Sequence, residues 1–147
     1  MLRRPVRRLR SGRFQVHLSS DERELLRSLP GQLKVLLGTD DPSLRRLFPP
    51  AYRDDEEQEA EYKRLTREDL LERHTAALDV MTGTVDATEL SEEQLSGWLS
   101  AINDLRLVLG TQLDVTEDDI GGETALHELY RYLSYLEEMV VEALAGW

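Results

Sequence analysis

Cysteine is absent from the 147 residues of this sequence. Without it the residues form no disulfide, no thiolate nucleophile and no cysteine-ligated zinc or iron–sulfur site, and a cytoplasmic location is the default. Long apolar runs are absent too: no stretch approaches the roughly 18 apolar residues of a membrane span. The basic N-terminus also lacks the apolar core of a signal peptide. We therefore expect a cytoplasmic protein that does not enter a membrane.

Strand-forming residues are scarce as well. There are 27 leucines against 2 isoleucines and 9 valines, and leucine favours helices. Apolar residues recur every three or four positions in four segments, at residues 19–38, 66–81, 91–109 and 124–144. Phe14, Val16 and Leu18 show the alternation of a strand, and we pair them with a second, shorter alternation at Leu113–Val115. The sequence predicts a mainly α single-domain bundle of four to five helices with a small two-stranded β ribbon.

Helix starts are indicated by three capping-box pairs, in which a side chain near the N-terminus bonds to a backbone amide: Ser19 with Glu22, Thr66 with Asp69, and Ser91 with Gln94. Pro30 interrupts the first helical segment, so we expect a kink or two short helices there. Asp41 and Pro42 fit the N-cap and first position of a further short helix.

Catalytic motifs are missing from the sequence. There is no glycine-rich phosphate loop, no G-x-S-x-G and no H-E-x-x-H. Of the three histidines, His17, His74 and His127, none follows a glutamate at the spacing that di-metal helical bundles use. We expect ordinary surface or partly buried histidines and a protein that is not an enzyme and holds neither metal nor cofactor.

Charge divides the chain into two parts. Residues 1–13 carry six arginines and no acid, whereas residues 14–147 carry a net charge of −17. We therefore distinguish a basic N-terminal arm, 1–13, from a single helical domain, 14–147. The arm is either a solvated tail against its own acidic surface or a segment that binds phosphates or an acidic partner. The candidate contacts to nucleic acid are Arg3, Arg4, Arg7, Arg8 and Arg10. Six acids lie between residues 54 and 61. Those proposed to contact a partner are Asp54, Asp55, Glu56 and Glu57.

Two further groups are structural or partner-binding candidates. Asn103, Asp104 and Arg106 interrupt the most apolar helical segment, and an arginine held there needs a carboxylate. This pattern fits either a half-buried ion pair that fixes helix register or a partner contact. Tyr132 and Tyr135 lie beside the main leucine stripe of the last segment. They fit either burial between helices or an exposed groove or homodimer seam.

Four runs resemble an actinobacterial family of unknown function that includes AosR-like oxidative-stress transcriptional regulators. They are DPSLRRLFP at 41–49, AYRDD at 51–55, YKRLT at 62–66 and NDLRLVLGT at 103–111. The resemblance implies a small cytoplasmic regulator that contacts a sigma factor, encoded beside the ClpS adaptor of proteolysis. It also implies a thiol–disulfide switch, which these residues cannot form because they contain no cysteine.

Two functional hypotheses follow. The first is a non-enzymatic interaction domain that recruits a sigma factor, or another transcription or proteolysis component, through its acidic helical body. The alternative is DNA binding by the arginine-rich arm, although no expected helix is basic enough to read a DNA groove.

Overall fold

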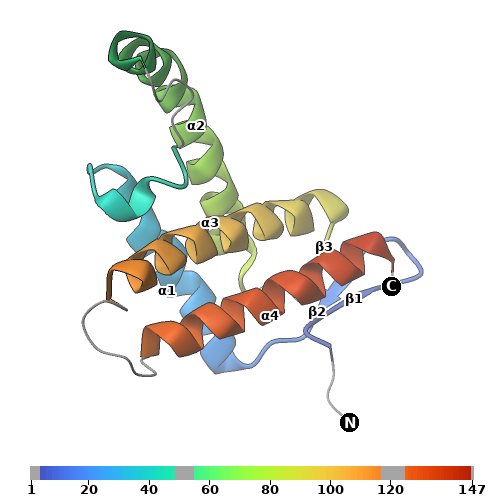
Figure 1. The fold of residues 1–147 in the computed structure, drawn as a ribbon. Coiled ribbons are helices and arrows are strands. Elements are labelled where there is room, and N and C mark those ends of the chain that lie inside the picture. The colour runs from blue at the N-terminus through green and yellow to red at the C-terminus, as the bar shows by residue number, and fades with distance from the viewer. Residues whose placement is uncertain (1–3, 49–54, 117–124, 147) are drawn as a thin grey trace.

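The computed structural model describes residues 4–48, 55–116 and 125–146. The mainly α fold is confirmed (Figure 1). The elements in these ranges are the strands β1 (Val6–Arg8), β2 (Phe14–Val16) and β3 (Glu89–Leu90), the helices α1 (Ser20–Leu37), α2 (Glu56–Thr84), α3 (Glu92–Thr116) and α4 (Ala125–Ala145), and the short 3₁₀ helix η1 (Pro42–Leu44).

The three strands form one antiparallel sheet in the order β1-β2-β3. Val6 pairs with Val16, and Phe14 pairs with Leu90; all four side chains are buried. The alternation of β2 is therefore that of a strand with one face in the core, as expected. β1 lies inside the segment assigned to the basic arm, so these residues belong to the sheet, and the tight connection to β2 uses Gly12 at φ +88°.

The predicted partner of β2 was wrong. Residues 113–115 lie in α3, and β2 pairs with β1 and β3 instead. The physical reason is that Leu105, Leu109 and Leu113 are all buried at a spacing of four, so the helical period continues past the point where a strand was expected.

The helix starts follow the predicted caps at two of three places. At α1, the Ser19 hydroxyl accepts from the Glu22 amide and the Glu22 carboxylate accepts from the Ser19 amide, each at 3.1 Å. Ser91 and Gln94 make the same exchange at α3. α1 runs on as one helix through the buried Pro30, where two short helices were one alternative.

The predicted helix start at Thr66 was wrong. Its hydroxyl donates to the Tyr62 carbonyl at 2.7 Å inside α2, which begins at Glu56. Asp55 is the N-cap, since its side chain accepts from the Gln58 amide at 3.0 Å. The acidic first turn complements the helix dipole and no helix breaker follows it, so one long helix contains the whole predicted segment 66–81.

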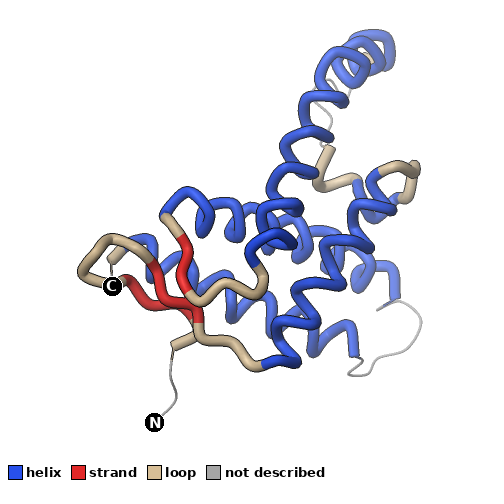
Figure 2. The backbone as a smooth tube through the Cα atoms, turned by 180° about the vertical axis from the view of Figure 1, so that it is seen from behind, coloured by secondary structure: helices blue, strands red, loops and turns tan. Residues whose placement is uncertain are grey.

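The core lies around α3, which packs against α1, α2 and α4, and it includes the buried residues of the sheet (Figure 2). Trp98 is fully buried, and its indole N–H donates to the Thr84 hydroxyl at 2.7 Å. α2 and α3 approach closely at Gly97, where an added Cβ would lie 2.9 Å from Val80 Cγ1. No described helix is both long and apolar enough to cross a bilayer.

α2 is only partly packed. Its buried residues, Ala77, Leu78 and Met81, lie near its C-terminal end, and its N-terminal half extends away from the other helices in both ribbon views (Figures 1 and 2). At 1.5 Å per residue its 29 residues span about 43 Å. The projecting half forms one wall of the site described next.

Candidate functional site

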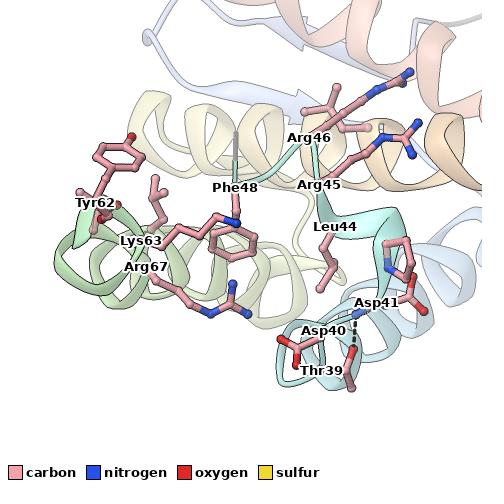
Figure 3. Close-up of a pocket in the computed structure, with 14 residues that line it drawn as sticks. Thr39, Asp40, Asp41, Leu44, Arg45, Arg46, Phe48, Tyr62, Lys63 and Arg67 are labelled. Atoms are coloured by element: carbon pink, nitrogen blue, oxygen red, sulfur yellow. Dashed lines mark hydrogen bonds between the residues drawn. The ribbon is translucent and has the colours of Figure 1, made fainter. Parts of the chain in front are cut away.

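A pocket of about 960 Å³ lies between η1 and the projecting half of α2 (Figure 3). Its apolar lining is Leu44, Phe48, Leu70 and Leu107, and its basic lining is Arg45, Arg46, Lys63 and Arg67. Asp40 and Asp41 also line the pocket and lie close to Thr39 in Figure 3. The pocket therefore combines an apolar lining with clustered positive charge.

Local capping creates the η1 wall. The Asp41 carboxylate accepts from the Ser43 hydroxyl at 2.5 Å and from the Ser43 amide at 2.8 Å, and these two bonds hold the pKa of Asp41 below its ordinary value. Pro42 supplies the first helical position, as predicted. The turn then buries Leu44 and leaves Arg45 on the surface.

The basic side chains of the pocket differ in their partners. Arg46 donates to Asp114 of α3 at 2.6 Å. The Arg67 guanidinium lies over the Phe48 ring, 4.7 Å from its centroid. Among the described residues, no carboxylate lies within 4.0 Å of Arg45, Lys63 or Arg67. Three cations therefore face this pocket without an ion pair inside the described part of the chain.

His74 connects three elements beside the pocket. Its Nδ1 lies 2.7 Å from the Asp104 carboxylate of α3, and its Nε2 lies 3.2 Å from the Leu47 carbonyl after η1. The hydrogen bond to Asp104 raises the pKa of His74 above its ordinary 6.5, against the lowering effect of burial. Phe48 packs edge-on against the imidazole, 5.6 Å between ring centroids. The imidazole, which contacts a partner at each ring nitrogen, thus holds the η1 segment against α2 and α3.

The segment from Asn103 to Arg106 divides between two interfaces. Asp104 is only 6% exposed and faces His74, whereas Arg106 faces α4 and Asn103 is on the surface. Arg106 forms an ion pair with Glu137 and donates to the Ser134 hydroxyl at 3.0 Å. The carboxylate that this arginine was expected to need is therefore Glu137.

The two tyrosines of α4 also separate. The Tyr132 hydroxyl donates to the Glu22 carboxylate in the first turn of α1 at 2.7 Å, and burial raises the pKa of Tyr132. Burial alone would raise the pKa of Glu22, but hydrogen bonds from Tyr132 and Ser19 outweigh it and lower that pKa. Tyr135 is 47% exposed. Tyr132 thus lies between helices, and Tyr135 contributes to the surface.

The arginines of the N-terminal segment contact their own protein. Arg8 donates to the carbonyls of Ala143 and Leu144, at 3.3 and 2.7 Å, where its positive charge complements the C-terminal end of α4. The others are placed as follows: Arg4 donates to Glu142 at 3.4 Å, Arg7 donates to Gln15 at 2.9 Å, Arg10 is exposed, and Arg3 lies outside the described residues.

The acidic candidates lie at the start of the projecting helix. Asp55, Glu56 and Glu57 are exposed there, and Asp54 lies outside the described residues. In the described ranges, no three histidine or carboxylate side chains are grouped so as to hold a metal ion. The described candidates therefore do not form one cluster, because they lie at separate places on the fold.

Sequence comparison gives the family. A profile described as a domain of unknown function, DUF2017, matches residues 3–144. The chain belongs to the DUF2017 family. No solved structure matches it.

Among relatives of this DUF2017 chain are proteins described as oxidative stress regulator AosR. Those of Mycobacterium tuberculosis (strain ATCC 25618 / H37Rv) and Mycobacterium bovis (strain ATCC BAA-935 / AF2122/97) are each 30% identical to it over 129 residues. Each alignment covers 72% of this chain and 59% of the relative. The resemblance expected from the sequence is therefore confirmed, and the match extends over about three fifths of the relatives' length.

The pocket of this DUF2017 protein was missed by sequence reasoning. Arg45, Phe48 and Lys63 all lie in the runs that carry the family resemblance, but they were not considered as one site. Arg67 lies just beyond those runs. The available signal was the set of bases at 63, 64 and 67, directly after an acidic stretch, and only the fold shows that η1 supplies the opposite wall.

Proposed function

We propose that this chain is a non-enzymatic regulatory domain of an oxidative-stress response that works by binding a protein partner, and that the partner is a sigma factor. The family membership and the regulator names of the relatives support the regulatory part. The sigma factor is the partner class that the family resemblance implies. With no cysteine, these residues contribute a partner contact and not a disulfide switch.

The observation that carries the proposal is the projecting half of α2. Leu65 is 68% exposed there, and every buried residue of α2 lies beyond Thr75. A helical segment with so little tertiary packing gains little stability from its own protein, so a partner that covers it would stabilise it. This makes the projecting half a surface suited to a second protein.

The negative charge at the start of α2 suits a basic partner. Asp55, Glu56 and Glu57 occupy the exposed start of the helix. Proteins that bind nucleic acid, sigma factors among them, present basic surfaces. An acidic helix end followed by an exposed leucine would bind such a surface by charge attraction and by burial of one apolar side chain.

The test measures binding of the purified chain to each purified sigma factor of its source genome by biolayer interferometry. We expect Leu65→Asp and the double variant Glu56→Lys/Glu57→Lys to weaken binding to one sigma factor at least tenfold. The matched control is Val35→Asp, which alters an equally isolated surface side chain of α1, 77% exposed. Binding to none of the sigma factors, or an equal loss in the control, would contradict the proposal.

DNA binding by the N-terminal arginines is the alternative. Arg4 and Arg8 would have to exchange their contacts with α4 for phosphates, which weakens this candidate. Six phosphate contacts would give a slope of about −5 for the logarithm of affinity against the logarithm of salt concentration. Replacing Arg3, Arg4, Arg7 and Arg10 by glutamine, which leaves β1 and its buried Val6 in place, would have to abolish DNA binding for the alternative to hold.

A further inference from the structure

The pocket between η1 and α2 has a character opposite to that of the whole chain. The chain has 29 acidic and 18 basic residues, yet four basic and two acidic side chains line this pocket. One of the acids, Asp41, already accepts two hydrogen bonds from Ser43. One of the bases, Arg46, is paired with Asp114. Arg45, Lys63 and Arg67 remain available to a ligand of negative charge.

Phe48 gives the pocket an apolar anchor point. The ring is partly buried and packed edge-on against His74, while one face lies beneath Arg67. Leu44 beside it belongs to the core and is fixed by the Asp41 cap of η1. In Figure 3, Phe48 lies between the Lys63 and Arg67 side chains and the η1 backbone. An apolar group entering here would contact Phe48 with cations on either side.

We infer that this pocket binds an acidic peptide segment of a partner protein, with a large apolar side chain seated against Phe48 and carboxylates paired with Arg45, Lys63 and Arg67. Charge complementarity supports this occupant, because cations with no ion pair in the described part of the chain border an apolar lining on a protein that is otherwise acidic. A nucleic-acid backbone fits less well, because it offers no apolar side chain and would meet Asp40 at the same pocket.

This inference rests on the proposed function, since it gives the partner a second point of contact besides the exposed Leu65. The two contacts would bind parts of the partner that differ in charge. The acidic start of α2 fits a basic surface, whereas the pocket fits an acidic and apolar segment.

The probe is a fluorescein-labelled ten-residue peptide that alternates glutamate with leucine, and the readout is fluorescence anisotropy. Two comparison peptides replace leucine by serine or glutamate by lysine. We expect the glutamate–leucine peptide to bind at least tenfold more tightly than either comparison, and more weakly as salt rises. Equal binding of the glutamate–serine peptide would overturn the inference, because attraction to positive charge alone would explain it.

Variants of the pocket locate the binding. Lys63→Glu and Arg67→Glu are each expected to weaken the peptide at least tenfold. Arg73→Glu is the matched control, since Arg73 is an exposed base of α2 outside the pocket lining. Circular dichroism spectra and melting curves show that each variant is folded, and Lys63 is the safer test because no described side chain pairs with it. An equal loss in the Arg73 variant would contradict a pocket site.

The peptide assay contains no sigma factor, so the two proposals fail separately. No peptide binding together with tight sigma-factor binding would overturn the pocket and leave the proposed function in place. Peptide binding without any sigma-factor binding would overturn the proposed function and leave the pocket as a peptide site. Self-association that Lys63→Glu abolishes would show a second copy of this chain in the pocket, which would overturn a partner segment as its occupant.

Discussion

The pair formed by His74 and Asp104 allows a quantitative prediction of how stability changes with pH. Asp104→Asn replaces a buried carboxylate by an amide of nearly the same shape, so the hydrogen bond to His74 loses its charge but not its geometry. The bond measures 2.7 Å and both side chains are largely buried. Solvent therefore screens this pair much less than it screens a surface ion pair.

The expected loss of stability in Asp104→Asn follows from the strength of the hydrogen bond between His74 and Asp104. Bonds to charged groups contribute about 1.5–3 kcal/mol, and neutral ones about 0.5–1.5 kcal/mol. The substitution should therefore lower the free energy of unfolding by about 1–2 kcal/mol while the imidazole is charged. The folded protein raises the pKa of His74 above the ordinary 6.5. The extra stability is thus fully present below pH 6.5 and is lost as pH rises through the raised pKa.

The assay is urea unfolding followed by circular dichroism at about pH 5.5 and about pH 8.5. We expect a gap of about 1–2 kcal/mol between the parent chain and the Asp104→Asn variant at the lower pH, and a smaller gap at the higher pH. Asp79→Asn is the control, because Asp79 pairs with Lys34 at the surface and should cost at most about 1 kcal/mol at either pH. A gap that stays constant or widens as pH rises would contradict a stabilising bond between charged His74 and Asp104.

Three further predictions concern packing between helices. Gly97→Ala should lower the free energy of unfolding by about 1–3 kcal/mol in urea titrations, because the added methyl group would overlap Val80 of α2. Gly83→Ala should instead raise it by about 0.5–1 kcal/mol, because the space around Gly83 is open and alanine favours a helix. Arg106→Ala should cost about 3 kcal/mol in the same assay, since it leaves the Glu137 carboxylate unpaired between α3 and α4. Tyr132→Phe should lose about 1 kcal/mol, and an unchanged midpoint would contradict its bond to α1.

Much of the fold could be predicted from the sequence because local chemistry determines it. The caps at Ser19, Asp41 and Ser91 use side chains within three residues of the amides they bind, so spacing alone reveals them. The partner of β2 could not be predicted in this way. Strand pairing is a long-range property, and the three-residue β1 lies in a stretch dominated by arginine, which conceals its buried Val6.

The candidate site was less accessible to sequence reasoning. The need of Arg106 for a carboxylate followed from its position among apolar residues, but nothing distinguished Glu137 among 29 acids. The pocket combines η1 with α2, and its character depends on which bases remain unpaired. The sequence contains Arg45 and Lys63 without indicating that they face one cavity.

The proposed contact between the projecting half of α2 and a sigma factor is tested by comparing the affinities of the parent chain, Leu65→Asp and Val35→Asp for the purified sigma factors. We expect one sigma factor to bind the parent and the Val35 variant equally and to bind the Leu65 variant at least tenfold more weakly. Equal affinity for all three proteins, or no binding of any sigma factor, would contradict this contact.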